Sequence, residues 1–190
     1  MNKSELRKIF IAKRKEISPS ERNEKSRAIF DHIFDYFDFT KMNFVHCFLP
    51  IERFKEIDTH LLFHDVWQRF PNIQTVVPRV DFENVEMESV VYDAETELRE
   101  NDWNIREPVH NIFVEAEKID AVFVPLLCAD ERGFRVGYGK GFYDRFLKDC
   151  REDCLKIGLD YAAPIEEISD VNEFDIKLDF LVTSEKVYGF

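Results

Sequence analysis

The sequence predicts an α/β fold, a single-domain three-layer α/β/α sandwich with a mostly parallel sheet. The chain has 190 residues, a length that suits one domain around a single core. It contains no internal repeat, low-complexity stretch or Pro/Ser-rich linker, so we expect one domain over residues 1–190. Segments with helical spacing of apolar residues alternate with short apolar runs, and this alternation favours a parallel sheet covered by helices on both faces.

Two helices are predicted at the start of the chain. Residues 3–16 place apolar side chains at helical spacing with Lys and Arg opposite them, which predicts a basic amphipathic helix. Ser18, Pro19 and Glu21 then indicate a capping box with proline in the first turn of a second helix. The apolar residues of that helix keep four-residue steps, at Ile29, Ile33 and Phe37.

The rest of the chain is predicted to alternate strands and helices. Short apolar runs predict strands at 44–49, 73–80, 86–92, 121–125, 155–159 and 180–183, of which the third can run antiparallel. Helices are expected at 59–70 and 142–150, and an irregular polar segment at 101–108. Ligands of such sheets collect beyond the carboxyl ends of the strands, where loop 50–56 and the glycine-rich segment 133–145 are expected.

Composition and charge narrow the function classes. Hydrophobic residues make up 45% of the chain and charged residues 34%, which is typical of a soluble globular protein. The net charge of −12 argues against general nucleic-acid affinity, which needs a basic surface. No apolar run approaches the roughly 18 residues that cross a bilayer, and the start of the chain lacks the apolar core of a secretory signal. The four cysteines form no Cys-x-x-Cys pair and are interpreted as reduced thiols, so we expect a cytoplasmic protein without membrane or nucleic-acid partners.

The segment 133–145, GFRVGYGKGFYDR, carries the strongest functional signal. It holds four of the six glycines of the chain, a density that indicates backbone close to a ligand or with positive φ. The segment lies between a predicted buried strand and a predicted helix, an arrangement that directs N–H groups and a helix dipole toward an anion. We therefore expect it to bind phosphate, with a flexible loop of solvated charges as the alternative.

This segment matches neither of two common nucleotide-binding motifs. A P-loop needs a glycine where Phe134 stands and Ser or Thr where Gly141 stands. A dinucleotide fingerprint would need its third glycine at Phe142. The charged residues still suit a nucleotide, because Arg135 and Lys140 can pair with phosphate oxygens and an acid at 144 can hold a divalent cation.

The segment resembles the signature of the 5-formyltetrahydrofolate cyclo-ligase family, also called methenyltetrahydrofolate synthetases. The resemblance extends collinearly over nearly the whole chain. Outside the segment it is carried by Lys3, Leu6, Arg7, Glu56, Ile57, Asp58, Thr59, Trp103, Asn104, Ile105, Glu107, Pro108, Val124, Pro125, Asp130 and Asp175. The resemblance implies an enzyme that uses ATP and Mg²⁺ to close 5-formyltetrahydrofolate into 5,10-methenyltetrahydrofolate, through a phosphorylated formyl (imidate) intermediate and with release of ADP and phosphate.

The resemblance also implies roles for individual residues. Lys140 and Arg135 would act in catalysis, and Asp144 and Asp175 would hold magnesium. The ATP-binding residues would be Lys3, Arg7, Arg135, Val136, Gly137, Tyr138, Gly139, Lys140, Gly141, Phe142 and Tyr143. The folate-binding residues would be Leu49, Glu56, Trp103, Tyr138, Gly139, Lys140, Gly141 and Phe142.

Several of these residues have a purely structural alternative. Lys3 and Arg7 lie one turn apart and could both reach a polyphosphate, with Arg14 as a further candidate, but cations on a helix are commonly solvated. Either proposed magnesium ligand could be a helix cap or a surface acid. Trp103 could stack on a ligand or fill the core. Phe142 stands where relatives commonly have tyrosine, so ring stacking would remain and the hydroxyl hydrogen bond would be absent.

Two other functions stay open at this point. One is an enzyme that handles sugar phosphates or coenzyme A esters on a similar fold, against which Glu56 and the magnesium-type acids argue. The other is a non-catalytic regulator that binds folate or nucleotide. No G-x-S-x-G or Cys-His pattern supplies a nucleophile, which agrees with a site that only positions its two substrates. We expect ATP and 5-formyltetrahydrofolate as ligands of a monomer or weak dimer.

Overall fold

The computed structural model describes residues 1–190, and one eight-stranded sheet forms its centre. The strand order is β12-β11-β10-β7-β1-β2-β3-β6. Five central strands are parallel: β11 (Phe180–Val182), β10 (Leu155–Leu159), β7 (Ala121–Pro125), β1 (Phe44–Cys47) and β2 (Gln74–Asp81). The antiparallel strands lie at the two edges: β12 (Val187–Gly189), β3 (Glu86–Val91) and β6 (Phe113–Val114). The predicted mostly parallel sheet is confirmed.

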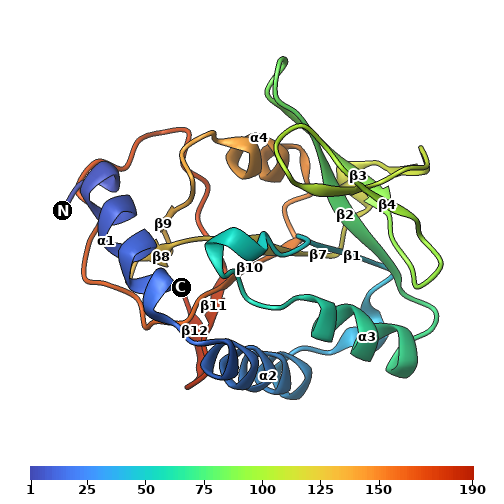
Figure 1. The fold of residues 1–190 in the computed structure, drawn as a ribbon, viewed down its shortest axis with the longest axis horizontal. Coiled ribbons are helices and arrows are strands. Elements are labelled where there is room, and N and C mark those ends of the chain that lie inside the picture. Colours follow the sequence, from blue (N-terminus) through green and yellow to red (C-terminus); the bar gives the residue numbers. More distant parts are fainter.

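Helices cover both faces of this sheet (Figure 1). On one face α2 (Pro19–Tyr36) and α3 (His60–Arg69) enclose a cluster of 22 buried residues, because each turns an apolar stripe toward the strands. On the other face α4 (Phe142–Asp149) covers a second cluster of 11 residues. The three predicted layers are therefore present, and no helix is long and apolar enough to cross a membrane.

The first helix lies outside these layers. Helix α1 (Lys3–Glu16) packs through Leu6 and Phe10 on the hairpin formed by β8 (Cys128–Ala129) and β9 (Arg135–Val136). The glycine-rich segment lies between β7 and α4, as predicted, but its first residues form part of this hairpin, which was not predicted. Two-residue strands give no periodic signal in a sequence, so the hairpin could not be recognised.

The helix caps differ from the prediction. Ser18 caps α2 by accepting a hydrogen bond from the Glu21 N–H (3.2 Å), but the Glu21 carboxylate pairs with Lys25 (2.9 Å) instead of returning to the cap. The predicted capping box is therefore only half formed. A complete box begins α1, where Asn2 and Glu5 each accept the other's N–H, at 2.9 and 3.0 Å.

Two predicted segments end or fold differently in the structure. The strand predicted at 44–49 ends at Cys47, because the Phe48 carbonyl accepts a hydrogen bond from the Thr59 hydroxyl (2.6 Å) rather than from a neighbouring strand. The segment 101–108 is not wholly irregular, since β5 (Arg106–Pro108) pairs with β4 (Leu98–Glu100). Three 3₁₀ turns complete the fold: η1 (Phe39–Lys41), η2 (Glu52–Phe54) and η3 (Ala116–Lys118).

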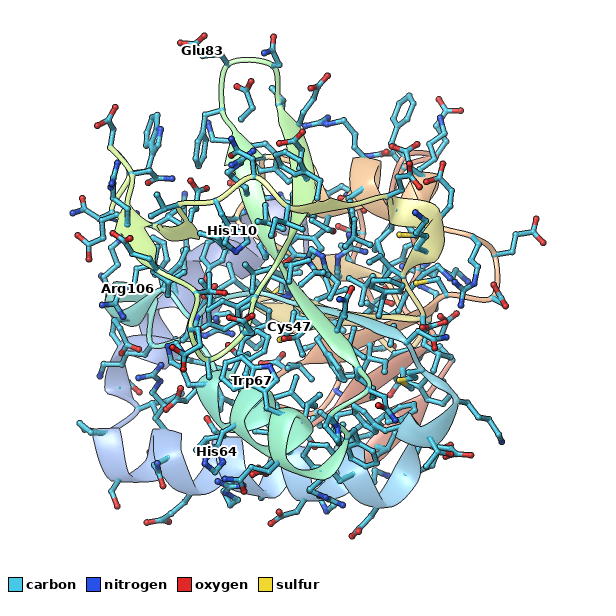
Figure 2. All side chains as sticks on the ribbon, turned by 90° about the vertical axis from the view of Figure 1, so that its right-hand side faces the viewer. Cys47, His64, Trp67, Glu83, Arg106 and His110 are labelled. Atoms are coloured by element: carbon cyan, nitrogen blue, oxygen red, sulfur yellow. The ribbon has the colours of Figure 1, made fainter.

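The sheet topology places a crevice at the carboxyl ends of β1 and β7. From β1 the chain continues to β2 on one side, whereas from β7 it continues toward β10 on the other, so these neighbours form the topological switch point. Ligands of open α/β sheets bind at this point. Loop 50–56 follows β1, and the β8–β9 hairpin with the glycine-rich segment follows β7. The hairpin between β2 and β3 projects from the body with Glu83 at its tip (Figure 2).

Gly158 provides a test of core packing. A Cβ at this position of β10 would lie 2.6 Å from side-chain carbons of both Leu126 and Leu178. We expect Gly158→Ala to lower the free energy of unfolding by about 1–3 kcal/mol through overpacking, as measured by urea denaturation. Gly189→Ala is the control, because its Cβ would meet its nearest neighbour at an ordinary 3.5 Å. Equal stability of the two variants would contradict this account of the packing.

Candidate active site

The glycines of segment 133–145 serve two different purposes. Gly133 (φ 88°) turns the β8–β9 hairpin, where a Cβ would lie 2.9 Å from the Leu178 carbonyl oxygen. Gly139 (φ 94°) lies against the Arg7 guanidinium, whose Cζ would be 3.1 Å from a Cβ. Positive φ and close approach both favour glycine here. Gly133 is therefore a structural residue, and only the glycines between β9 and α4 remain candidates for backbone that approaches a ligand.

The start of α4 has the features of an anion site. Gly141 (φ 70°) is the N-cap, and no side chain caps the first turn, so its N–H groups lack an acceptor from a side chain. Arg7 reaches the same place from α1 and donates to the Gly137 carbonyl (2.9 Å). Lys140 is exposed and forms no ion pair. Free N–H groups, a helix dipole and two cations together suit a phosphate.

Arg135 lies beneath this loop and not on its surface. Its guanidinium donates to Asp144 Oδ1 (2.9 Å) and to the Ile176 carbonyl, and the residue is 8% exposed. Burial lowers the pKa of Arg135, while the charges of Asp144 and Asp175 oppose that shift. The buried guanidinium of Arg135 is therefore held against one of the two acids, Asp144, whereas Asp175 pairs with Lys3.

The two predicted magnesium ligands differ in their surroundings. Asp144 Oδ1 accepts from Arg135 and from the Ile176 N–H (3.1 Å), whereas its Oδ2 accepts no hydrogen bond. Asp175 is ion-paired with Lys3, at 2.6 Å to each carboxylate oxygen. No group of three or more His, Cys, Asp or Glu side chains is placed to hold a metal ion. Magnesium usually needs only one or two carboxylates together with phosphate and water oxygens, and Asp144 with its free oxygen fits that donor set.

Glu56 is brought directly to the glycine-rich segment. Its Oε1 accepts from the Tyr138 hydroxyl and its Oε2 from the Ile51 N–H, both at 2.7 Å. The residue is 3% exposed, and burial raises the pKa of its carboxyl group, opposed by these hydrogen bonds and by the charges of Arg14 and Arg22. A carboxylate fixed in this way is a hydrogen-bond acceptor held in place between loop 50–56 and the glycine-rich segment.

Two predicted site residues have buried side chains, and a third is half-buried. Leu49 lies in the core under α2 and α3, and Val136 lies under α1. Tyr143 belongs to α4 and is half-buried against the core on that face of the sheet. The Tyr143 hydroxyl is buried without a hydrogen-bond partner, beside His46, whose ring lies 5.9 Å from the Tyr143 ring. Any contact of Val136 with a nucleotide would therefore come from its backbone.

Three aromatic side chains pack against one another beside the start of α4. Trp103, in the turn between β4 and β5, is 54% exposed, so the alternative that it fills the core is wrong. Its ring lies 4.7 Å from that of Phe82, which lies 5.4 Å from that of Phe142. Two hairpins therefore bring aromatic rings to the glycine-rich segment. Phe82 was not predicted as a site residue. Its contact with Phe142 depends on the turn that follows β2, which is visible only in the structure.

Arg14 and Asp160 form a buried pair that the sequence did not reveal. Arg14 donates to the Leu126 carbonyl (2.6 Å) and lies 3.8 Å from Asp160 Oδ1. It reaches the glycine-rich segment only through the Tyr138 hydroxyl (3.4 Å). Asp160 could have been found from the sequence, because it directly follows the apolar run 155–159. Polar site residues commonly lie at the carboxyl ends of parallel strands.

Asp160 is expected to make the stability of the protein depend on pH. Burial raises its pKa to about 7, against the opposing charges of Arg14 and Lys13. Between the unfolded pKa and this value the folded state binds a proton that the unfolded state does not, so stability falls as pH rises through the window. We expect Asp160→Asn to gain stability relative to the wild type as pH rises from 4 to 8, by about 4 kcal/mol at most. Urea denaturation at several pH values measures this difference, and a constant difference would contradict it.

Comparison with known proteins identifies the family. The 5-formyltetrahydrofolate cyclo-ligase family matches residues 1–184. The 5-formyltetrahydrofolate cyclo-ligase of Escherichia coli is 26% identical over 179 residues, covering 93% of this chain and 97% of that protein. The enzyme of the same name from Mycoplasma pneumoniae is 24% identical over 188 residues, covering 97% and 100%.

Solved structures agree with this match. The NMR structure of 5,10-methenyltetrahydrofolate synthetase from Aquifex aeolicus superposes with a TM-score of 0.83 at 32% identity, covering 100% of this chain and 93% of that one. The synthetase structure from Mycoplasma pneumoniae, at 23% identity and a TM-score of 0.76, shows the same fold. The family match covers both the glycine-rich segment and loop 50–56. The chain therefore belongs to the 5-formyltetrahydrofolate cyclo-ligase family of enzymes.

Proposed function

We propose that this protein catalyses the ATP- and Mg²⁺-dependent cyclisation of 5-formyltetrahydrofolate to 5,10-methenyltetrahydrofolate, with release of ADP and phosphate. One observation carries the proposal most directly. The Tyr138 hydroxyl of the glycine-rich segment bonds to the Glu56 carboxylate of loop 50–56 at 2.7 Å. A loop with the features of a phosphate site and a fixed carboxylate that suits the N–H donors of a pterin are thus parts of one site.

The reaction needs activation of an unreactive formamide oxygen. In the proposed sequence that oxygen attacks the γ-phosphorus of ATP, and the bond to the β–γ bridging oxygen breaks to release ADP. The substrate's N10 then adds to the activated formyl carbon and loses its proton, and the carbon–oxygen bond breaks with departure of phosphate. All atoms come from the two substrates, so the protein needs no nucleophile.

The side chains divide this work. Lys140 and Arg7, with the free N–H groups at the start of α4, would bind the triphosphate and stabilise charge on the transferring group. Glu56 would hold the pterin ring of the folate. The rings of Trp103, Phe82 and Phe142 would contact the second aromatic ring of the folate, which is attached to the pterin. Lys3, which is ion-paired with Asp175, would be a further cation for the triphosphate.

Magnesium would be held by Asp144, with Asp175 as the second acid. When bound, the metal neutralises charge on the phosphate oxygens. Arg135 orients Asp144 from below through its 2.9 Å hydrogen bond, which keeps the other carboxylate oxygen available.

A steady-state assay tests the proposed function. The absorbance of methenyltetrahydrofolate and the release of phosphate are followed together after protein, Mg²⁺, ATP and 5-formyltetrahydrofolate are mixed. We expect equal rates of both, and no signal when any one component is omitted. Binding of folate or nucleotide without turnover would instead favour the non-catalytic regulator, and would overturn the proposal.

A further inference from the structure

Loop 50–56 has an unfavourable backbone conformation immediately before Glu56. Lys55 ends the short turn η2 with φ 47° and ψ 45°, in the left-handed region. A residue with a Cβ is strained there, so the surrounding structure must hold Lys55 in place. Its neighbour Glu56 is the buried carboxylate that the proposed function assigns to the pterin. The backbone conformation of Lys55 therefore sets the direction in which the Glu56 side chain leaves the chain.

The side chain of Lys55 provides one support for this conformation. Its ammonium nitrogen donates to the Lys15 and Ile17 carbonyl oxygens, both at 2.6 Å. These carbonyls belong to the carboxyl end of α1, where the last C=O groups of a helix lack partners within the helix and the helix dipole favours a cation. Helix α1 is itself packed on the β8–β9 hairpin through Leu6 and Phe10. Lys55 thus joins the loop to a fixed element of the fold.

The two peptide groups that flank Glu56 are also held from outside the loop. The Lys55 carbonyl accepts a hydrogen bond from the Tyr161 hydroxyl (3.0 Å), and the Glu56 carbonyl accepts one from Arg22 Nε (2.6 Å). Arg22 in addition pairs with Glu52 of the same loop (2.6 Å). Three separate parts of the chain therefore hold the backbone around Glu56. Of these contacts, the one with α1 is made by the side chain of the strained residue itself.

We propose that Lys55 is a positioning residue for the folate site. Its hold on the carboxyl end of α1 keeps the left-handed turn, and the turn orients the Glu56 carboxylate. The inference rests on the proposed function, in which Glu56 accepts N–H groups of the pterin. Lys55 acts through Glu56, so its contribution belongs to the binding of folate and not of ATP. Arg7, the proposed ATP contact of α1, lies about 12 Å from Lys15 along the helix axis.

Two substitutions separate this role from a general loss of stability. Lys55→Met removes the ammonium group but keeps a side chain in the strained conformation, so the turn is expected to relax. We expect the Kd for 5-formyltetrahydrofolate, measured by calorimetry without ATP, to rise roughly tenfold. Lys55→Gly loses the same contact with α1, but glycine adopts positive φ without strain. Its Kd is expected to rise by no more than about threefold.

Stability and ATP kinetics complete the comparison. Urea denaturation should show that Lys55→Gly is no more stable than Lys55→Met, because both lose the same hydrogen bonds and glycine adds entropy to the unfolded chain. A purely structural role would make folate affinity follow stability. Tighter folate binding by the glycine variant is therefore the distinguishing result. The KM for ATP should stay within about twofold of the wild-type value in both variants.

Lys41→Met is the control for the loss of a lysine. The Lys41 side chain is 81% exposed and pairs with Asp38 on the surface, so this variant should leave the Kd for folate unchanged. If Lys55→Met does not fold, Lys55→Ala replaces it, since alanine is strained in the same conformation. Equal folate affinity of Lys55→Met and the wild type, or no tighter binding by Lys55→Gly than by Lys55→Met, would overturn the role of Lys55. A wild type that binds no folate would instead overturn the proposed function, and this inference with it.

Discussion

Replacing Lys140 with alanine is expected to lower kcat by about 10²–10³-fold, with little change in the KM for folate. Lys140 is the exposed cation of the glycine-rich segment, and it has no ion-pair partner to share its charge. In the proposed reaction its ammonium group stabilises charge that develops on the transferring phosphoryl group, so its loss affects the transition state more than substrate binding. Initial rates of methenyltetrahydrofolate formation at varied ATP and folate concentrations separate these effects.

The control for this variant is Lys148→Ala. Lys148 is also exposed and lies on α4, in the turn farthest from the glycines. It should retain wild-type kinetics, because surface charges at that distance are screened by salt. Equal rates for Lys140→Ala and the wild type would show that the segment does not bind the reacting phosphate.

Replacing Glu56 with glutamine is expected to raise the KM for folate by roughly 10–100-fold, with a smaller effect on kcat. The carboxylate already accepts from Tyr138 and Ile51, and its remaining lone pairs are free to accept N–H groups of the pterin. Glutamine replaces one acceptor oxygen by an NH₂ group. This NH₂ group would then face another donor in a buried place, either the Ile51 N–H or an N–H of the pterin. Titration of folate in steady-state assays measures the change.

Glu56 also predicts how folate affinity depends on pH. Burial raises the pKa of this carboxyl group, so the wild type should lose folate affinity as pH falls through the raised value, because protonation removes an acceptor. The glutamine variant should lack this dependence. Glu52→Gln, which changes a 68% exposed side chain of the same loop, is the control. An identical pH profile of KM in Glu56→Gln and the wild type would contradict the assignment of Glu56.

The order and layers of the fold could be predicted because they depend on local patterns. The spacing of Ile29, Ile33 and Phe37 identified α2, and the apolar run 121–125 identified β7. Features that depend on tertiary contacts could not be predicted. Strand β1 ends early because the Thr59 hydroxyl donates a hydrogen bond to the carbonyl of Phe48, 11 residues earlier in the chain. The β8–β9 hairpin is too short to have a period of its own.

The site shows the same division. The glycines and Lys140 are close in sequence, so their chemistry was visible there. The hydrogen bond between Tyr138 and Glu56 joins residues 82 positions apart and appears only in the folded chain. Burial was also not visible in the sequence. Arg135 is 8% exposed and donates a hydrogen bond to Asp144, while its predicted role with ATP stays a prediction. Arg14, a further candidate for a contact with phosphate, is also buried, and it lies 3.8 Å from Asp160.

Isotope transfer from the formyl group tests the central claim most directly. 5-Formyltetrahydrofolate labelled with ¹⁸O in the formyl oxygen is turned over with unlabelled ATP, and the phosphate released is analysed by mass spectrometry. Because that oxygen is proposed to capture the γ-phosphoryl group and to depart with it, each phosphate should carry one ¹⁸O atom. Phosphate without the label, released at the same rate as methenyltetrahydrofolate forms, would contradict capture of the phosphoryl group by the formyl oxygen.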